Sequence, residues 1–132
     1  MVSELEDVDS IIEDEDYLFR GVPPAQWDFE NNRPGTFSFN TDELSVDWSQ
    51  KRTCLDFMER ERRKELGHGC VRFKARFPRQ ECSLTVRYAP EINNDAHSLV
   101  LGKKPKLFLK AIKRRDGNFE VVEHARTAPA AS

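Results

Sequence analysis

Four polar residues interrupt apolar segments, and each carries a group that can do chemistry. Arg20 lies within an apolar run, where a guanidinium needs a carboxylate, a carbonyl oxygen or a ligand as partner. Ser45 and Asp47 alternate with apolar residues, and His97 begins an apolar stretch. Arg20, Asp47 and His97 are the catalytic candidates, with Arg20 binding an anion while Asp47 or His97 handles a proton. The alternative is a structural Arg20–Asp47 ion pair in the core.

A second group of candidates consists of clustered cations. Arg72, Lys74 and Arg76 alternate with apolar residues, and Lys103 and Lys104 precede a basic, amphipathic segment. Clustered cations bind phosphates and release their counterions, so these five residues are candidate contacts for nucleic acid or an acidic protein. The alternative interpretation is an ordinary solvated sheet and helix face.

Common catalytic and cofactor signatures are absent from the sequence. It contains no phosphate loop, no dinucleotide-binding glycine motif, no zinc-peptidase motif and no nucleophile elbow. His68 and Cys70 are the one close pair of metal-ligand types, whereas zinc needs three or four. We therefore expect neither a metal nor a cofactor. A cysteine–histidine pair formed in space stays open, because such pairs need not be close in sequence.

Charge is divided sharply along the chain. Residues 1–50 carry a net charge of −11, and residues 51–115 carry a net charge of +11. One interpretation is that the basic half binds an acidic partner. The other, which we favour, is that the acidic front lies near the basic back and neutralises it, and so competes for the same face.

The length of 132 residues fits one domain. Residues 1–16 hold eight carboxylates and no cation, so we expect a disordered acidic leader there, a folded body over 17–123 and a disordered tail over 124–132. The start of the chain lacks a basic and an apolar signal region, and three unevenly spaced cysteines do not suit a disulfide framework. These features predict a cytoplasmic location without a membrane partner, and they leave the oligomeric state open.

The order of predicted elements indicates the fold class. Short alternating runs predict strands, and two stripes with helical spacing predict helices, one capped by Ser49 and running to Leu66, the other from Pro105 through Arg115. Strands separated by short polar loops favour an α+β fold, a mostly antiparallel sheet with two helices packed on it. The predicted strands cover residues 17–22, 36–39, 44–48, 70–77, 83–88, 97–101 and 119–122.

Four blocks of the chain resemble recurring blocks of small bacterial proteins that have no established activity. The resemblance implies that Arg20, Ser45, Asp47 and His97 belong to one constellation. The blocks are residues 18–24 (LFRGVPP), 33–39 (RPGTFSF), 44–48 (LSVDW) and 96–103 (AHSLVLGK).

A second resemblance is to ADP-ribosyltransferase-type domains, including RES-type toxins and RNA 2′-phosphotransferases. These folds place an arginine or histidine on an early strand and a serine-bearing strand after it. The resemblance implies that Arg20 grips a phosphate or pyrophosphate while Ser38 or Ser45 helps to hold the ligand. The chain departs from the pattern, because Glu120 and Glu123 do not form the expected Q-x-E or E-x-E block on a late strand.

Two functions follow as predictions. The first is a cytoplasmic bacterial binding or accessory module that recognises a partner protein or nucleic acid. The alternative is an ADP-ribosyltransferase-like enzyme that acts on NAD or RNA, with NAD as its cofactor.

Overall fold

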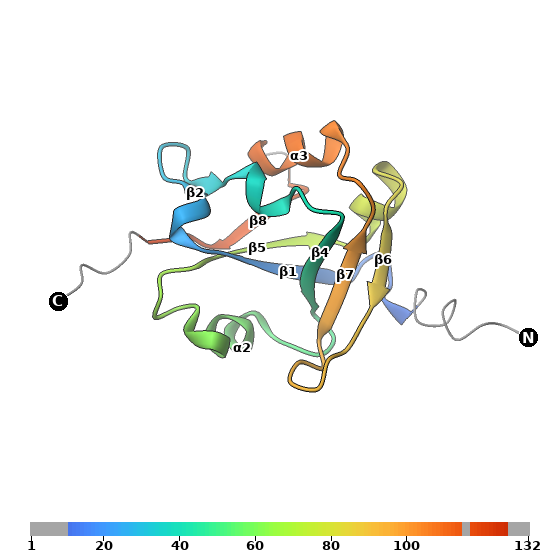
Figure 1. Cartoon of the computed structure of the whole chain (residues 1–132), viewed down its shortest axis with the longest axis horizontal. Coiled ribbons are helices and arrows are strands. Elements are labelled where there is room, and N and C mark those ends of the chain that lie inside the picture. The colour runs from blue at the N-terminus through green and yellow to red at the C-terminus, as the bar shows by residue number, and fades with distance from the viewer. Residues whose placement is uncertain (1–10, 115–116, 127–132) are drawn as a thin grey trace, which may run out of the picture.

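A six-stranded antiparallel sheet organises the fold (Figure 1). The computed structural model describes residues 11–114 and 117–126. Strands lie in the order β6-β7-β4-β1-β5-β8, and every pair is antiparallel. The α+β class expected from the sequence is confirmed. The strands are β1 (Tyr17–Val22), β4 (Glu43–Trp48), β5 (Gly69–Lys74), β6 (Thr85–Tyr88), β7 (His97–Leu101) and β8 (Glu120–Glu123).

Among the described residues, the sheet carries one helix on each face, α3 above and α2 below in Figure 1. Helix α3 (Lys106–Lys113) buries Phe108 among other aromatic rings, including Phe73 and Phe119, and full burial of such a ring stabilises the fold by roughly 1.5–3 kcal/mol. Helix α2 (Cys54–Glu59) packs Phe57 against Phe19 on the opposite face. Because α2 spans six residues, this second face has a much smaller apolar cover than the first.

The middle of the sheet opens between β1 and β4. Strand β1 pairs with β5 along all six of its residues, but it pairs with β4 at two positions, Leu18↔Trp48 and Phe19↔Asp47. In Figure 1, β4, β7 and β6 run steeply across the nearly horizontal β1, β5 and β8. The strong twist therefore separates β1 from β4 beyond Phe19.

The helix expected from Ser49 to Leu66 is much shorter in the structure. Helix α2 begins after Thr53, whose side-chain oxygen accepts a hydrogen bond from the Asp56 amide at 3.1 Å. It ends at Glu59, and the 3-10 turn η3 (Arg60–Arg62) follows with Glu61 at a positive φ of 53°. The apolar stripe ends at Met58, so the charged residues after it had no buried face to hold a longer helix.

Two strand predictions also need correction. Residues 36–39 form the 3-10 turn η2 (Thr36–Phe39), in which Phe37 is 83% exposed, so alternation there did not reflect a sheet. Strand β5 ends at Lys74, and the π-helical turn η4 (Phe77–Glu81) follows, since Pro78 cannot donate to a ladder. The remaining short elements are η1 (Pro24–Gln26), β2 (Trp27–Asp28) and β3 (Arg33–Pro34), with β2 paired to β3.

The folded body is longer than the predicted 17–123. Ile12 is 1% exposed in the main core, and the Ala75 amide donates to the Asp16 carbonyl at 2.9 Å, so residues 11–16 are not part of a disordered leader. At the other end, Ala125 is buried and the Arg126 amide donates to Gly67. The rest of the predicted leader and tail, residues 1–10 and 127–132, lies outside the described residues.

Within the part of the chain that the structure describes, none of the helices has the length and apolar character needed to cross a bilayer.

Candidate functional site

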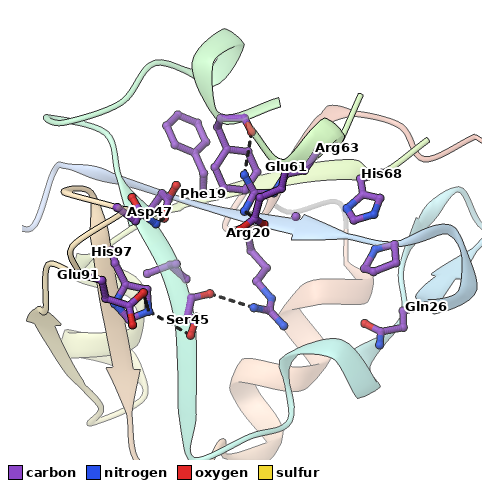
Figure 2. Close-up of a pocket in the computed structure, with 15 residues that line it drawn as sticks. Phe19, Arg20, Gln26, Ser45, Asp47, Glu61, Arg63, His68, Glu91 and His97 are labelled. Atoms are coloured by element: carbon purple, nitrogen blue, oxygen red, sulfur yellow. Dashed lines mark hydrogen bonds and ion pairs between the residues drawn. The ribbon is translucent and has the colours of Figure 1, made fainter. Parts of the chain in front are cut away.

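A pocket of about 480 Å³ lies where β1 and β4 separate, on the face that carries α2. Arg20, Ser45, Asp47 and His97 all line it, as Figure 2 shows. These four residues come from β1, β4 and β7, and the sheet brings them together although they span 78 positions of the sequence. The remaining walls come from α2 and the turn after it, from the loop that precedes β7, and from residues of and beside η1 and β5.

Arg20 occupies the gap between the separating strands. Its Nη1 donates to the Ser45 carbonyl at 3.0 Å (Figure 2). Its Nη2 donates to the Ser38 carbonyl at 2.9 Å. The guanidinium thus bridges β1, β4 and η2 where no strand ladder does. Its Nε is buried and has no hydrogen-bond partner among the described residues.

The predicted Arg20–Asp47 ion pair is wrong. Asp47 is 4% exposed, and its carboxylate lies 3.2 Å from the Nε of Arg52 while it accepts a hydrogen bond from Asn94 at 2.9 Å. Arg52 also forms an ion pair with Asp95 at 3.0 Å. Asp47 therefore ties β4 to the loop before β7, and its charge is compensated without Arg20.

Arg63 is a pocket residue that sequence reasoning missed. Its guanidinium lies over the Phe57 ring at 4.0 Å and forms an ion pair with Glu61 at 3.3 Å. A Cβ at Gly21 would approach the Arg63 Nε to 3.1 Å, so the glycine allows this close approach to β1. The sequence offered no signal, because Arg63 belongs to a charged run that the prediction placed on a solvated helix.

Arg20 and Arg63 both line the pocket, together with the carboxylates of Asp47, Glu61 and Glu91. Burial lowers the pKa of Arg20, and the nearby Arg63 charge lowers it further. Burial also lowers the pKa of Arg63, against the opposing effects of Glu61 and Asp47. Glu61 is 73% exposed in its side chain, so the carboxylate nearest to Arg63 stays in water.

His97 and Ser45 form a polar pair in the same pocket. The His97 Nδ1 lies 2.7 Å from the Ala89 carbonyl, which can only accept, so this nitrogen carries the proton. Nε2 is then free to accept from the Ser45 hydroxyl, 3.3 Å away. A carboxylate oxygen of Glu91 lies 3.8 Å from the same Nε2.

The structure does not place Ser38 among the pocket-lining residues. Its side chain is 5% exposed, and the hydroxyl donates to the Gly35 carbonyl at 2.9 Å. Ser38 contributes its carbonyl, which accepts from Arg20, and not its hydroxyl.

The predicted cationic face is already occupied by carboxylates. Glu15 contacts Lys74 at 2.7 Å and Arg76 at 3.2 Å, and Arg72 forms an ion pair with Glu120 at 3.1 Å. The acidic segment therefore neutralises part of the basic face, as one of the two charge interpretations expected.

The prediction that Lys104 binds a partner is wrong. It is 4% exposed, and its Nζ donates to the carbonyls of Thr41, Val100 and Gly102. Burial lowers its pKa. Its neighbour Lys103 is exposed and stays a candidate.

Cysteine and metal chemistry receive little support from the geometry. Across residues 11–114 and 117–126, no group of three or more histidine, cysteine, aspartate or glutamate side chains is arranged to hold a metal ion. Cys70 is buried beneath α2, and burial raises the pKa of its thiol. His68 lines the pocket, and burial lowers its pKa.

Comparisons with known proteins add no assignment. No protein-family model matches the chain, and neither a curated protein nor a solved structure matches it.

Proposed function

We propose that this chain is a binding module whose pocket recognises a small ligand bearing a phosphate or carboxylate group. The observation that carries the proposal is the placement of Arg20 and Arg63 around one pocket. A guanidinium presents a planar set of donors that matches carboxylate and phosphate oxygens.

The electrostatics of the pocket support an anionic ligand. Partial burial disfavours the charged form of Arg20 and is the main reason that its pKa is lowered, and the like charge of Arg63 lowers that pKa further. An anion between them would stabilise both charged forms.

The size of the pocket favours a small molecule over a chain. A volume of about 480 Å³ lies within the range of roughly 300–1,000 Å³ typical of small-molecule sites. Recognition of a partner protein or nucleic acid through Lys74 and Arg76 stays a prediction, and it requires displacement of Glu15.

The ADP-ribosyltransferase alternative also stays a prediction. Arg20 lies in a pocket, which suits a pyrophosphate-binding role, but the Ser38 hydroxyl is engaged with Gly35. The carboxylates that line the pocket, besides Asp47, are Glu61 and Glu91, which come from a turn and a loop and not from a late strand. NAD therefore belongs among the ligands to be tested.

Calorimetric titration with pyrophosphate, succinate and NAD tests the proposal. We expect at least one of these to bind, and Arg63→Gln to weaken its affinity about tenfold to a hundredfold, the effect of losing a charge-assisted hydrogen bond of roughly 1.5–3 kcal/mol. Arg62→Gln is the matched control, since Arg62 pairs with the exposed Glu65 and does not line the pocket. No binding at millimolar ligand, or equal loss in both variants, contradicts the proposal.

A conservative substitution is required at Arg20, because its hydrogen bonds to two backbone carbonyls connect β1, β4 and η2. Arg20→Lys keeps the positive charge and removes the planar, forked set of guanidinium donors. We expect it to weaken binding while the thermal midpoint, measured in the same buffer, shows that the chain is still folded.

A further inference from the structure

We propose that Ser45 and His97 form a nucleophile–base pair, and that the pocket hydrolyses esters of small acids that carry a second, anionic group. The choice of substrate class rests on the proposed anion-binding function. The nucleophile–base pair rests on separate contacts in the same pocket, those of His97 with Ala89 and with Ser45.

The His97 ring is held in the orientation that a general base requires. Its Nδ1–H donates to the Ala89 carbonyl at 2.7 Å, and the Ala89 amide donates to the His97 carbonyl at 3.0 Å. This reciprocal contact fixes both the ring and the tautomer, as the third member of a catalytic triad does. Nε2 is thereby directed at the Ser45 hydroxyl.

Ser45 is positioned as a nucleophile should be. Its hydroxyl lies 3.3 Å from Nε2, a separation typical of such pairs before substrate binds. Its backbone carbonyl is held by Arg20 at 3.0 Å, so strand β4 is anchored at this residue. The Ser45 side chain is exposed to the pocket, whereas its neighbours Leu44 and Val46 are buried in the core.

Glu91 completes the electrostatics of the pair. Its carboxylate oxygen lies 3.8 Å from Nε2 and is largely in water. Proton transfer from Ser45 makes His97 an imidazolium, and a nearby carboxylate stabilises that charge. Glu91 therefore favours the imidazolium that forms during the reaction. In the resting state it leaves Nε2 free to accept from the Ser45 hydroxyl.

The reaction follows from these positions. The Ser45 hydroxyl gives its proton to His97 Nε2 as Oγ attacks the ester carbonyl carbon, and the tetrahedral intermediate expels an alkoxide that takes this proton. Water then attacks the acyl-Ser45 carbonyl, giving a proton to Nε2. Collapse releases the acid and returns the proton to Oγ, so one ester and one water yield one acid and one alcohol. Arg20 and Arg63 hold the anionic group of the substrate.

A fluorophosphonate probe tests the nucleophile independently of the anion site, because the probe has no anionic group. We expect one adduct by intact mass, mapped to the peptide that contains Ser45. Ser45→Ala should abolish it, and His97→Ala should slow its formation about 10²- to 10⁴-fold, the usual contribution of a general base. Thr85→Ala, which removes an exposed hydroxyl from β6, should react like the wild type.

Absence of the adduct, or an adduct that persists in Ser45→Ala, overturns the proposal. His97→Asn guards against a folding artefact, since its amide can still donate to Ala89. Slow labelling in a folded His97→Asn variant supports the base assignment, and unchanged labelling contradicts it.

Hydrolysis of mono-p-nitrophenyl succinate and p-nitrophenyl acetate tests the substrate class. We expect a higher kcat/KM for the succinate ester, and we expect Arg63→Gln to lower that value about tenfold without affecting the acetate ester. If both esters are hydrolysed equally and Ser45→Ala loses this activity, the result supports the nucleophile–base pair and contradicts anion binding by the pocket. Hydrolysis that survives Ser45→Ala would overturn the nucleophile–base pair.

Discussion

Among the described residues, two buried cations, Arg33 and Lys104, and the half-buried Arg20 are held by backbone carbonyl oxygens. Arg20 bridges Ser45 and Ser38, Lys104 contacts three carbonyls, and Arg33 donates to the carbonyls of residues 112, 114 and 119. Arg33 in particular links the end of α3 to the start of β8. A sequence cannot reveal such partners, because every residue carries a carbonyl and only the fold determines which are adjacent.

Lys103 and Lys104 offer a matched test at the residue scale. Lys104→Met should lower the free energy of unfolding by roughly 2–3 kcal/mol, because it leaves buried carbonyls without their donor. Lys103→Met, one residue earlier and exposed, should change it by less than about 0.5 kcal/mol. Urea denaturation of the two variants measures the difference, and equal effects would contradict the structural role of Lys104.

The acidic segment over residues 11–16 is the element whose role changed most between sequence and structure. Its composition indicates a solvated leader, but Ile12 enters the core and the carboxylates after it contact β5 and η4. The buried Ile12, the ion pairs beside it and the backbone hydrogen bonds from Ala75 and Arg76 together anchor the segment.

Ile11 and Ile12 test this anchoring at the element scale. Ile12→Ala should cost roughly 2–5 kcal/mol of stability, the usual range for truncating a fully buried isoleucine. Ile11→Ala removes the same atoms from a side chain that is 44% exposed, and it should cost far less. Thermal or urea unfolding distinguishes them, and a neutral Ile12→Ala would mean that the segment is not docked.

The Glu15 contacts predict a pH dependence. The hydrogen bond from Lys74 lowers the pKa of Glu15 below its ordinary 4.5, so this ion pair stabilises the fold above that ordinary value. The contribution is lost as the pH falls through the lowered folded-state pKa. We expect wild type to be more stable than Glu15→Gln at pH 7 and the two to converge in acid. A constant difference across this range would contradict the assignment.

At the scale of the whole molecule, the opposite charges of the two halves meet on one surface. The net charge of −2 thus conceals an internal neutralisation, in which Glu15 lies between Lys74 and Arg76. Removal of that carboxylate should expose both cations to external anions.

Retention on a heparin column checks this consequence. Glu15→Gln should elute at higher salt than wild type, because Lys74 and Arg76 become available to polyanions. Glu13→Gln makes the same charge change on an exposed residue that forms no ion pair within the described chain, and it controls for net charge. Equal shifts in the two variants would mean that net charge alone, and not release of the face, governs retention.

Much of the sheet was predictable from the sequence. Alternation over Leu44 to Trp48 and over Val71 to Lys74 reflects burial of one face, which is a local property of period two. The predicted helix before Leu66 and the predicted strand over 36–39 failed, because both lie in segments whose conformation depends on what packs against them.

The residues of the candidate site were likewise only partly predictable from the sequence. Arg20, Ser45, Asp47 and His97 stood out in sequence as polar residues in apolar surroundings, and that local contrast was enough to group them. Arg63 carried no such contrast, so its place in the pocket could not be anticipated.

The sequence alone determined the α+β class, the core faces of several strands and the residues whose side chains could do chemistry, because each depends on neighbours a few positions away. Only the tertiary structure decided that β1 and β4 separate beyond Phe19, that Arg20 bonds to carbonyls and not to Asp47, and that His97 reaches Ser45. These features depend on the twist of the sheet and on contacts between residues far apart in the chain, which local patterns do not encode.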